Sequence, residues 1–333
     1  MLPAKKWVRM DYPGLTLTLE PAADSRRPLV LTPGEDLRGY VLSHLGRAAL
    51  FVTTCTSVLA VLLILLFVIY RSLAFVSGYS VVDFLTSSGW RPTAEPPEFG
   101  ALAILVGSLY VSFAALVFAV PVGILAAVFL SDILSWRARN VVKPIVEILA
   151  AIPSVAYGFF AVLVLAPWMQ KRFGFSTGTN ALNASIILAI MALPTIISVA
   201  EDSISALGRE LREASYSCGA TRMETMIKVV IPAAHSGIIA AVVLGMMRAI
   251  GETMVVWMAS GNATQIPHPW WDLSQSIRTM TATIAGEIGE APEGFQHRSA
   301  LFAIGVLLLI LTFSLNVVSE YFLARAKKAA GRA

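Results

Sequence analysis

The sequence predicts an all-α, polytopic membrane protein with six transmembrane helices. Of its 333 residues, 56% are hydrophobic and only 14% are charged, and the mean hydropathy is +0.73. An ordinary soluble domain carries about 25% charged residues, so this composition excludes that class. The apolar residues are gathered into uncharged runs long enough to cross a bilayer. The formal net charge is only +4, and no pattern supports nucleic-acid binding.

The N-terminal part of the chain is expected to be a cytoplasmic tail, residues 1–46, followed by one transmembrane helix. The tail is polar, basic and interrupted by prolines such as Pro13 and Pro28. It is too long for the charged start of a cleaved signal peptide. The first transmembrane helix is expected at 47–76, because residues 48–70 hold no charge over 23 positions, about 34 Å of helix.

A loop is expected over residues 77–100, on the periplasmic side, and a core of five further transmembrane helices over residues 101–325. Pro153 inside the third span of the chain predicts a kink or a break there, because proline removes a helical hydrogen bond. A short basic loop, residues 132–143, precedes that span, and a cytoplasmic tail is expected over residues 326–333. The five apolar runs of the core are 101–131, 148–170, 173–200, 233–260 and 299–319.

The distribution of Lys and Arg residues predicts the orientation. With six spans, both termini lie on the same side of the membrane. Of the 25 Lys and Arg residues, 18 fall in or next to the two tails, in the 132–143 loop and in the stretch 201–232, whereas 6 fall in the three other loops. Because positive residues concentrate in cytoplasmic loops, the termini and residues 201–232 are predicted to be cytoplasmic.

Residues 201–232, here called the polar loop, are predicted to form two short helices hinged at Gly219. Helix-forming residues flank this glycine on both sides. In the first helix, Leu207, Leu211 and Ala214 recur at helical spacing and give an amphipathic element. An interfacial helix lying on lipid is one interpretation. The loop mixes four basic with five acidic side chains, however, and this favours contact with a protein, because lipid-binding faces are enriched in Lys and Arg.

Arg248 and Glu252 are the candidate substrate-path residues. They lie one turn apart in the fifth predicted span, where a charged side chain costs roughly 3 kcal/mol. One interpretation is an intrahelical ion pair that neutralises itself, since residues four apart are neighbours on a helix. The other is that both face a water-filled path, with Arg248 meeting an anion and Glu252 either holding Arg248 or accepting a proton-bearing group of the substrate.

Other kinds of chemistry find little support in the sequence. Cys55 and Cys218 are expected to be reduced, and neither they nor the four scattered histidines have the spacing of a metal site. The chain contains no phosphate-binding G-x(4)-G-K-[ST] loop, so any ATP hydrolysis must come from another chain. We expect no cofactor and no catalytic residues.

The polar loop contains the run E-A-S-x-x-x-G-A, residues 213–220, and ends at Pro232. This pattern resembles the E-A-A-x-x-x-G loop of binding-protein-dependent ABC transporter permeases. Ser215 replaces the second alanine of that pattern, a mild departure. The resemblance implies the type I importer permease fold and a cytoplasmic coupling helix that docks into a groove of the ATPase subunit. The residues expected to couple to the ATPase are Glu213, Ala214, Gly219, Ala220 and Pro232.

Three further stretches resemble PstC-type permease subunits of phosphate ABC transporters. They are R-A-x-G-E-T-M at Arg248, L-A-x-I-P-S-V-x-Y-G at 149–158 and I-A-x-E-x-G-E-A at 284–291. The likeness covers about residues 80–320. It implies a permease subunit for inorganic phosphate in a prokaryotic cytoplasmic (inner) membrane, forming half of the translocation path, not itself an enzyme.

By the same likeness, the partners are a second permease of the PstA type, a PstB-type ATPase dimer and a periplasmic or lipid-anchored PstS-type phosphate-binding protein. The alternatives are the PstA-type sister subunit, or a permease for phosphonate, sulfate or molybdate. A membrane-embedded enzyme is a more distant alternative, because no nucleophile or metal cluster accompanies Arg248 and Glu252. A structural scaffold would have little reason to carry two charged side chains in mid-span.

Overall fold

The computed structural model describes residues 33–329 and divides the chain into two units, Met1–Leu63 and Ile64–Ala333. The first 32 residues of the predicted N-terminal tail lie outside the described residues, as do positions 330–333 of the predicted C-terminal tail. Helix α1, Pro33–Val76, runs from the first unit into the second, so it begins 14 residues before the expected first span. The longest stretch in it that suits a membrane is Val41–Val76.

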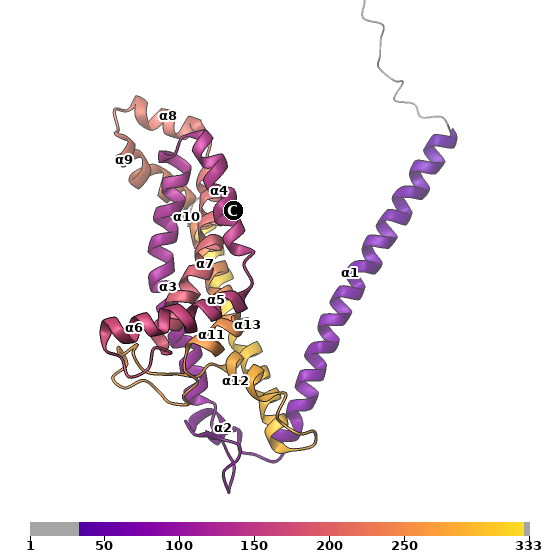
Figure 1. Ribbon diagram of the computed structural model, residues 1–333. Helices are drawn as coiled ribbons and strands as arrows, with labels where there is room; N and C mark the ends of the chain where they lie inside the picture. Colours follow the sequence, from indigo (N-terminus) through magenta and orange to yellow (C-terminus); the bar gives the residue numbers. More distant parts are fainter. Residues whose placement is uncertain (1–32, 330–333) are drawn as a thin grey trace, which may run out of the picture. The chain divides into compact units, whose positions relative to one another are not determined.

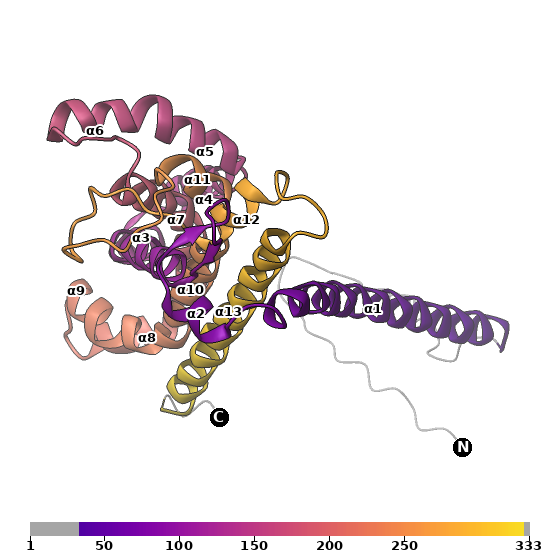
Figure 2. The ribbon, with the colours of Figure 1, turned by 90° about the horizontal axis from the view of Figure 1, so that it is seen from below.

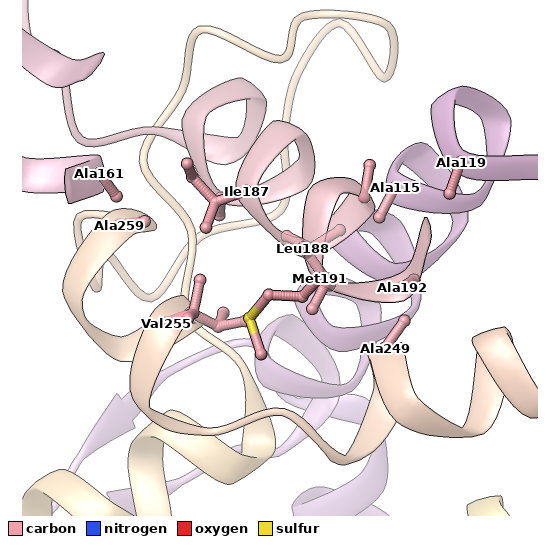
Figure 3. Packing of buried hydrophobic residues seen from close by; sticks show 14 of the residues in the cluster. Ala115, Ala119, Ala161, Ile187, Leu188, Met191, Ala192, Ala249, Val255 and Ala259 are labelled. Atoms are coloured by element: carbon pink, nitrogen blue, oxygen red, sulfur yellow. The ribbon is translucent and has the colours of Figure 1, made fainter. Parts of the chain in front are cut away.

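The second unit is built on three long apolar helices and α13. They are α3 (Leu102–Val128), α7 (Ala181–Ser205), α10 (Ile231–Gly251) and α13 (Gln296–Ala329). Helices α3 and α7 pack closely because small residues meet at their contact; a side chain at Gly123 of α3 would come within 2.7 Å of Ile196 of α7. Figure 3 shows this packing, with Ala115 and Ala119 beside Leu188 of α7.

The third predicted span is broken. It consists of α4 (Trp136–Ala150), α5 (Ser154–Phe160), the π-helical turn η2 (Ala161–Leu165) and α6 (Ala166–Phe173), with a bend of 86° at the break before α5. The kink or break predicted at Pro153 is therefore confirmed. The described residues contain five helices suited to crossing a membrane, or six if the bent pair counts as one span.

Residues 132–143, predicted to be a loop, are largely helical. The π-helical turn η1 (Phe129–Ile133) extends α3, and α4 begins at Trp136. The sequence misled here because the stretch is short and basic. Two of its three basic side chains, Arg139 and Lys143, form ion pairs with carboxylates on α7.

The fifth predicted span is also two elements. Helix α10 ends at Gly251, and α11 (Met254–Ala259) follows after a break at Glu252 and Thr253. An irregular segment with one parallel bridge, between Gly261 and Ile277, then leads to α12 (Met280–Glu287).

The stretch expected as a periplasmic loop carries its own small fold. Helix α2 (Val81–Thr86) is followed by strands β1 (Trp90–Arg91) and β2 (Glu98–Phe99), which pair antiparallel with Trp90 opposite Phe99. Phe75, Phe84, Trp90 and Phe99 are buried together with residues of α3, α12 and α13. In Figure 1, α2 lies at one end of the packed helices of this unit, and α8 (Arg209–Ser217) and α9 (Arg222–Thr225) lie at the other end. Figure 2 shows α3, α7 and α10 grouped together when this unit is seen from below.

Candidate functional site

The polar loop reverses direction at Gly219, as predicted. Helix α8 ends at Ser217, and Gly219 takes the left-handed conformation with φ +83°. Helix α9 then begins with a capping box, in which Thr221 and Glu224 satisfy each other's backbone N–H groups. Hydrogen bonds from the Thr221 backbone and hydroxyl hold the pKa of the Glu224 carboxyl below its ordinary value. The hinge predicted at this glycine and the short first helix are confirmed. The second helix is not short, because α9 continues through the π-helical turn Met226–Val230 into α10.

Helix α8 is fixed to the membrane-spanning helices by Arg212. Its guanidinium donates to the Asp132 carboxylate of η1 (Nε–Oδ1 3.0 Å) and to the carbonyls of Leu207 (2.8 Å) and Ile204 (3.1 Å) at the end of α7. The Ile204 carbonyl also accepts from the Leu207 N–H at 3.4 Å, and a cation suits the negative end of a helix. Asp132 and Arg212 are each only 15% exposed. The loop is therefore held at a defined place.

A second link joins the two arms of the loop. The hydroxyls of Ser215 in α8 and Thr225 in α9 lie 2.8 Å apart, and Thr225 is fully buried. Ser215 is one of the residues that depart from the family pattern, together with Val229 and Ile231, and in this chain its hydroxyl has a definite partner. The loop therefore turns at Gly219, and the Ser215–Thr225 contact links the helices on either side of that turn.

The residues predicted to couple to an ATPase lie on this loop or directly after it. Glu213, Ala214 and Gly219 are exposed, and Ala220 is half-buried beside the turn. Pro232 is exposed near the start of α10, directly after the π-helical turn Met226–Val230, and it has no N–H to donate to the turn before it. Glu213 and Ala214 lie in α8, and Gly219 and Ala220 lie in the turn that follows it. Pro232 lies apart from them, near the start of α10.

The predicted amphipathic face of α8 is only partly what the spacing indicated. Leu207 is buried, but it precedes the helix, which begins at Arg209. Leu211 is 38% exposed and Ala214 is also exposed, and α8 buries none of its own residues. The first arm of the loop therefore presents apolar and acidic groups outward.

A buried carboxylate network, not foreseen from the sequence, supports the base of the polar loop. Glu201 of α7 is 1% exposed and accepts from Arg139, from Lys143 (2.7 Å) and from the Ser205 hydroxyl (2.7 Å). A buried charge requires such pairing. A signal existed, since Glu201 directly follows a long apolar run and would need a cation if it were buried. Because 132–143 was predicted to be a loop, its cations were not expected to lie beside α7.

Arg248 and Glu252 do not form the intrahelical pair considered above. Glu252 follows the last residue of α10 and has an extended backbone (φ −72°, ψ 135°), so it is not one helical turn above Arg248. Within residues 33–329, no ion pair links the two side chains. Glu252 instead caps α11, accepting from the Val255 N–H at 3.4 Å, and its carbonyl accepts from the Thr281 hydroxyl at 2.9 Å.

Arg248 is left beside the break of the third span. Its Nη2 lies 3.5 Å from the carbonyl oxygen of Ala150, the last residue of α4, and its Nε is buried without a partner in the part of the chain that the structure describes. A guanidinium with an unused donor is costly in an apolar setting, and it is well suited to a planar oxyanion contact. The arrangement can bind an anion at the break in the helix.

The described residues add no metal-binding cluster to this site. No group of three or more His, Cys, Asp or Glu side chains in residues 33–329 could hold a metal ion. Cys55 and Cys218 are exposed and unbridged.

Residues 119–328 match the family described as the binding-protein-dependent transport system inner membrane component. A probable ABC transporter permease protein, YqgH, of Bacillus subtilis is 36% identical over 285 residues, covering 84% of this chain and 91% of that protein. The phosphate transport system permease protein PstC of Mesorhizobium japonicum is 37% identical, covering 73% and 78%. PstC of Pasteurella multocida is 34% identical, covering 75% and 82%.

Among solved structures, a chain of the MetNI methionine ABC transporter in an inward facing conformation is similar in fold. The TM-score is 0.53 with 20% sequence identity, and the alignment covers 70% of this chain and 99% of that chain. A second crystal form of the same transporter gives a TM-score of 0.52, also with 20% identity. At this identity the likeness concerns the fold alone.

Proposed function

Because the chain belongs to the family of binding-protein-dependent transport system inner membrane components, we propose that it is the permease subunit of an ABC importer for inorganic phosphate. The sequence-based predictions of a permease fold and of a transport component are confirmed by that membership. In the proposal, the subunit forms half of the translocation path and couples through the polar loop to an ATPase on a separate chain.

The observation that carries the proposal is the position of Arg248. It projects from a long apolar helix, its Nε is buried without a partner, and its remaining contact is a single carbonyl at the break of a neighbouring span. An arginine inside a membrane segment marks a substrate or ion path by default, because its cost must be offset by a function or by a carboxylate. The path role is supported by the extended backbone of Glu252, which among the described residues makes no ion pair with Arg248.

The anion is proposed to be phosphate from two lines of support. Two relatives whose names state phosphate transport are 34% and 37% identical to this chain over the aligned residues. In addition, phosphate near neutral pH carries about −1.5 to −2 charges and in part retains a proton, as the phosphoryl group of phosphoproteins does. A carboxylate such as Glu252 accepts hydrogen bonds only, so it favours protonated phosphate over sulfate.

Coupling is proposed to run through α8 and the turn at Gly219. Arg212 and the Ser215–Thr225 contact hold this arm against the spanning helices, while Leu211 and Glu213 face outward. A docked ATPase that moves the arm would then move the ends of α3 and α7 with it. Glu213, Ala214, Gly219, Ala220 and Pro232 are the proposed coupling residues.

The proposed partners are a PstA-type permease, a PstB-type ATPase dimer and a PstS-type phosphate-binding protein, in a prokaryotic cytoplasmic membrane with both termini cytoplasmic. Orientation can be tested with a reporter that is active only in the periplasm. It should be silent when fused after Gly208 and active when fused after Pro269. The opposite pattern would reverse the orientation and remove the coupling role from the polar loop.

The substrate is tested by uptake of radiolabelled phosphate into vesicles that hold the complete transporter. Excess sulfate, molybdate or phosphonate should leave the uptake largely unchanged, and uptake should require ATP. Preferential uptake of one of the competing anions would instead support the alternative oxyanion permease. Reconstitution with a PstA-type partner separates the two permease roles, since two copies of the same role would not give a working complex.

A further inference from the structure

A cavity of 360 Å³ lies between the polar loop and the ends of the spanning helices, within the size range of small-molecule sites. It is lined by residues of η1, α4, α7, α8 and α9. Four arginines line it, against one carboxylate: the lining holds Arg139, Arg209, Arg212 and Arg222, with Asp132. Such a concentration of one charge in a concave site attracts anions.

The four guanidinium groups are not equivalent. Arg139 and Arg212 are held in place by Glu201 and Asp132, so their positions are fixed. Arg209 and Arg222 are exposed, and their guanidinium groups make no hydrogen bond or ion pair with any other described residue. The site is therefore positively charged, and the hydrogen-bond donors of two of its four guanidinium groups have no partner within the described part of the chain.

The remaining polar groups of the lining also suit an oxyanion. The hydroxyls of Ser131 and Ser205 lie 3.4 Å apart, and Ser205 accepts from Arg139 at 2.8 Å. Guanidinium groups offer a planar fork of donors that matches phosphoryl oxygens, and a charge-assisted bond of this kind is strong. We propose that this cavity is a binding site for a phosphoryl oxyanion, either free phosphate or the phosphate of an anionic lipid headgroup.

The site is separate from the transport path proposed above. Arg248 is not part of its lining and instead contacts Ala150. On α8, Arg209, Arg212 and Tyr216 line the cavity at spacings of three and four residues and so share one face. Leu211 does not line the cavity. A bound oxyanion can therefore connect α8, α9 and α4 while the surface around Leu211 stays available for docking of the ATPase.

The test measures phosphate binding by the full chain with Arg248→Gln, which removes the transport-path arginine from the readout. The chain is placed in nanodiscs of phosphatidylcholine and titrated with inorganic phosphate by calorimetry. Phosphate should bind, and Arg209→Gln with Arg222→Gln should weaken binding at least about tenfold. Arg137→Gln is the matched control, because Arg137 is an exposed arginine of α4 outside the cavity lining.

Failure to bind phosphate in these discs, or an equal loss in the Arg137→Gln control, would overturn the proposal. Weakened assembly with the other subunits in the double variant, without any phosphate binding, would also overturn it and would assign the arginines to a protein contact. Neither result bears on uptake through Arg248. Both variants remove exposed side chains, and their thermal unfolding should match that of the parent chain.

The source of the phosphoryl group is decided by a second set of discs that contain phosphatidylglycerol. If the anionic lipid abolishes phosphate binding, the site is supported and the lipid headgroup is its occupant. If phosphate binds equally in both discs, the site is supported and free phosphate is its occupant.

Discussion

Removal of Arg212 should free α8 from the spanning helices without unfolding the protein. Arg212→Met keeps much of the side-chain length and removes three hydrogen bonds, to Asp132, Ile204 and Leu207. Bonds to a charged group contribute about 1.5–3 kcal/mol each, and partial exposure reduces this, so we take about 1 kcal/mol per bond. The local opening of α8 should therefore become easier by about 3 kcal/mol, which is about a hundredfold in population.

Hydrogen–deuterium exchange of the α8 amides in the purified chain measures this opening. Exchange in α8 should accelerate by up to about a hundredfold, limited by the rate of an unprotected amide, while α3 and α7 stay protected. Arg137→Met, at an exposed position outside this network, should change nothing. Unchanged exchange in α8 of the Arg212→Met variant would refute the anchoring role.

A double-mutant cycle separates the ion pair from the carbonyl contacts. Asp132→Asn alone should have a smaller effect than Arg212→Met, because the two bonds to α7 carbonyls remain. Adding Asp132→Asn to Arg212→Met should have little further effect, giving a coupling energy of about 1 kcal/mol. Fully additive effects would mean that the 3.0 Å contact contributes nothing.

Three further predictions concern the loop and the path. Gly219→Val should uncouple ATP hydrolysis from uptake, because φ +83° costs a β-branched residue about 1–2 kcal/mol, and Gly219→Asn should have a milder effect. Equal uptake by both variants and the parent would contradict the need for a left-handed residue at this position. Arg248→Gln should abolish phosphate uptake in an assembled complex, and Glu252→Gln should relax selectivity against sulfate; recovery of uptake in the double variant would show that the residues only neutralise each other. The pKa of Glu224 is lowered in the folded chain, so its stabilisation of the α9 cap is present above the ordinary carboxyl pKa and is lost as the pH falls through the folded pKa. Hydrogen exchange of the α9 amides should therefore accelerate at acid pH in the parent chain, and the Glu224→Gln variant should show no such step.

The sequence alone determined the class of protein, the number of apolar runs and the hinge of the polar loop. Each of these depends on local chemistry. A run of 23 uncharged residues must be buried in lipid or protein wherever it lies, and a glycine between two helix-forming stretches is free to take a left-handed turn. The break at Pro153 was predictable for the same reason, since proline lacks an N–H in any context.

The tertiary structure decided which charged groups meet. Glu201 and Arg139 are 62 positions apart, and Arg212 and Asp132 are 80 positions apart, so their pairing depends on how α3, α4 and α7 pack. The spacing of Arg248 and Glu252 suggested an ion pair, but α10 ends at Gly251 and the two side chains take different partners. Sequence spacing predicts contact only while the helix continues, and where a membrane helix ends inside the protein is set by neighbours that satisfy its freed backbone groups, such as Thr281 here.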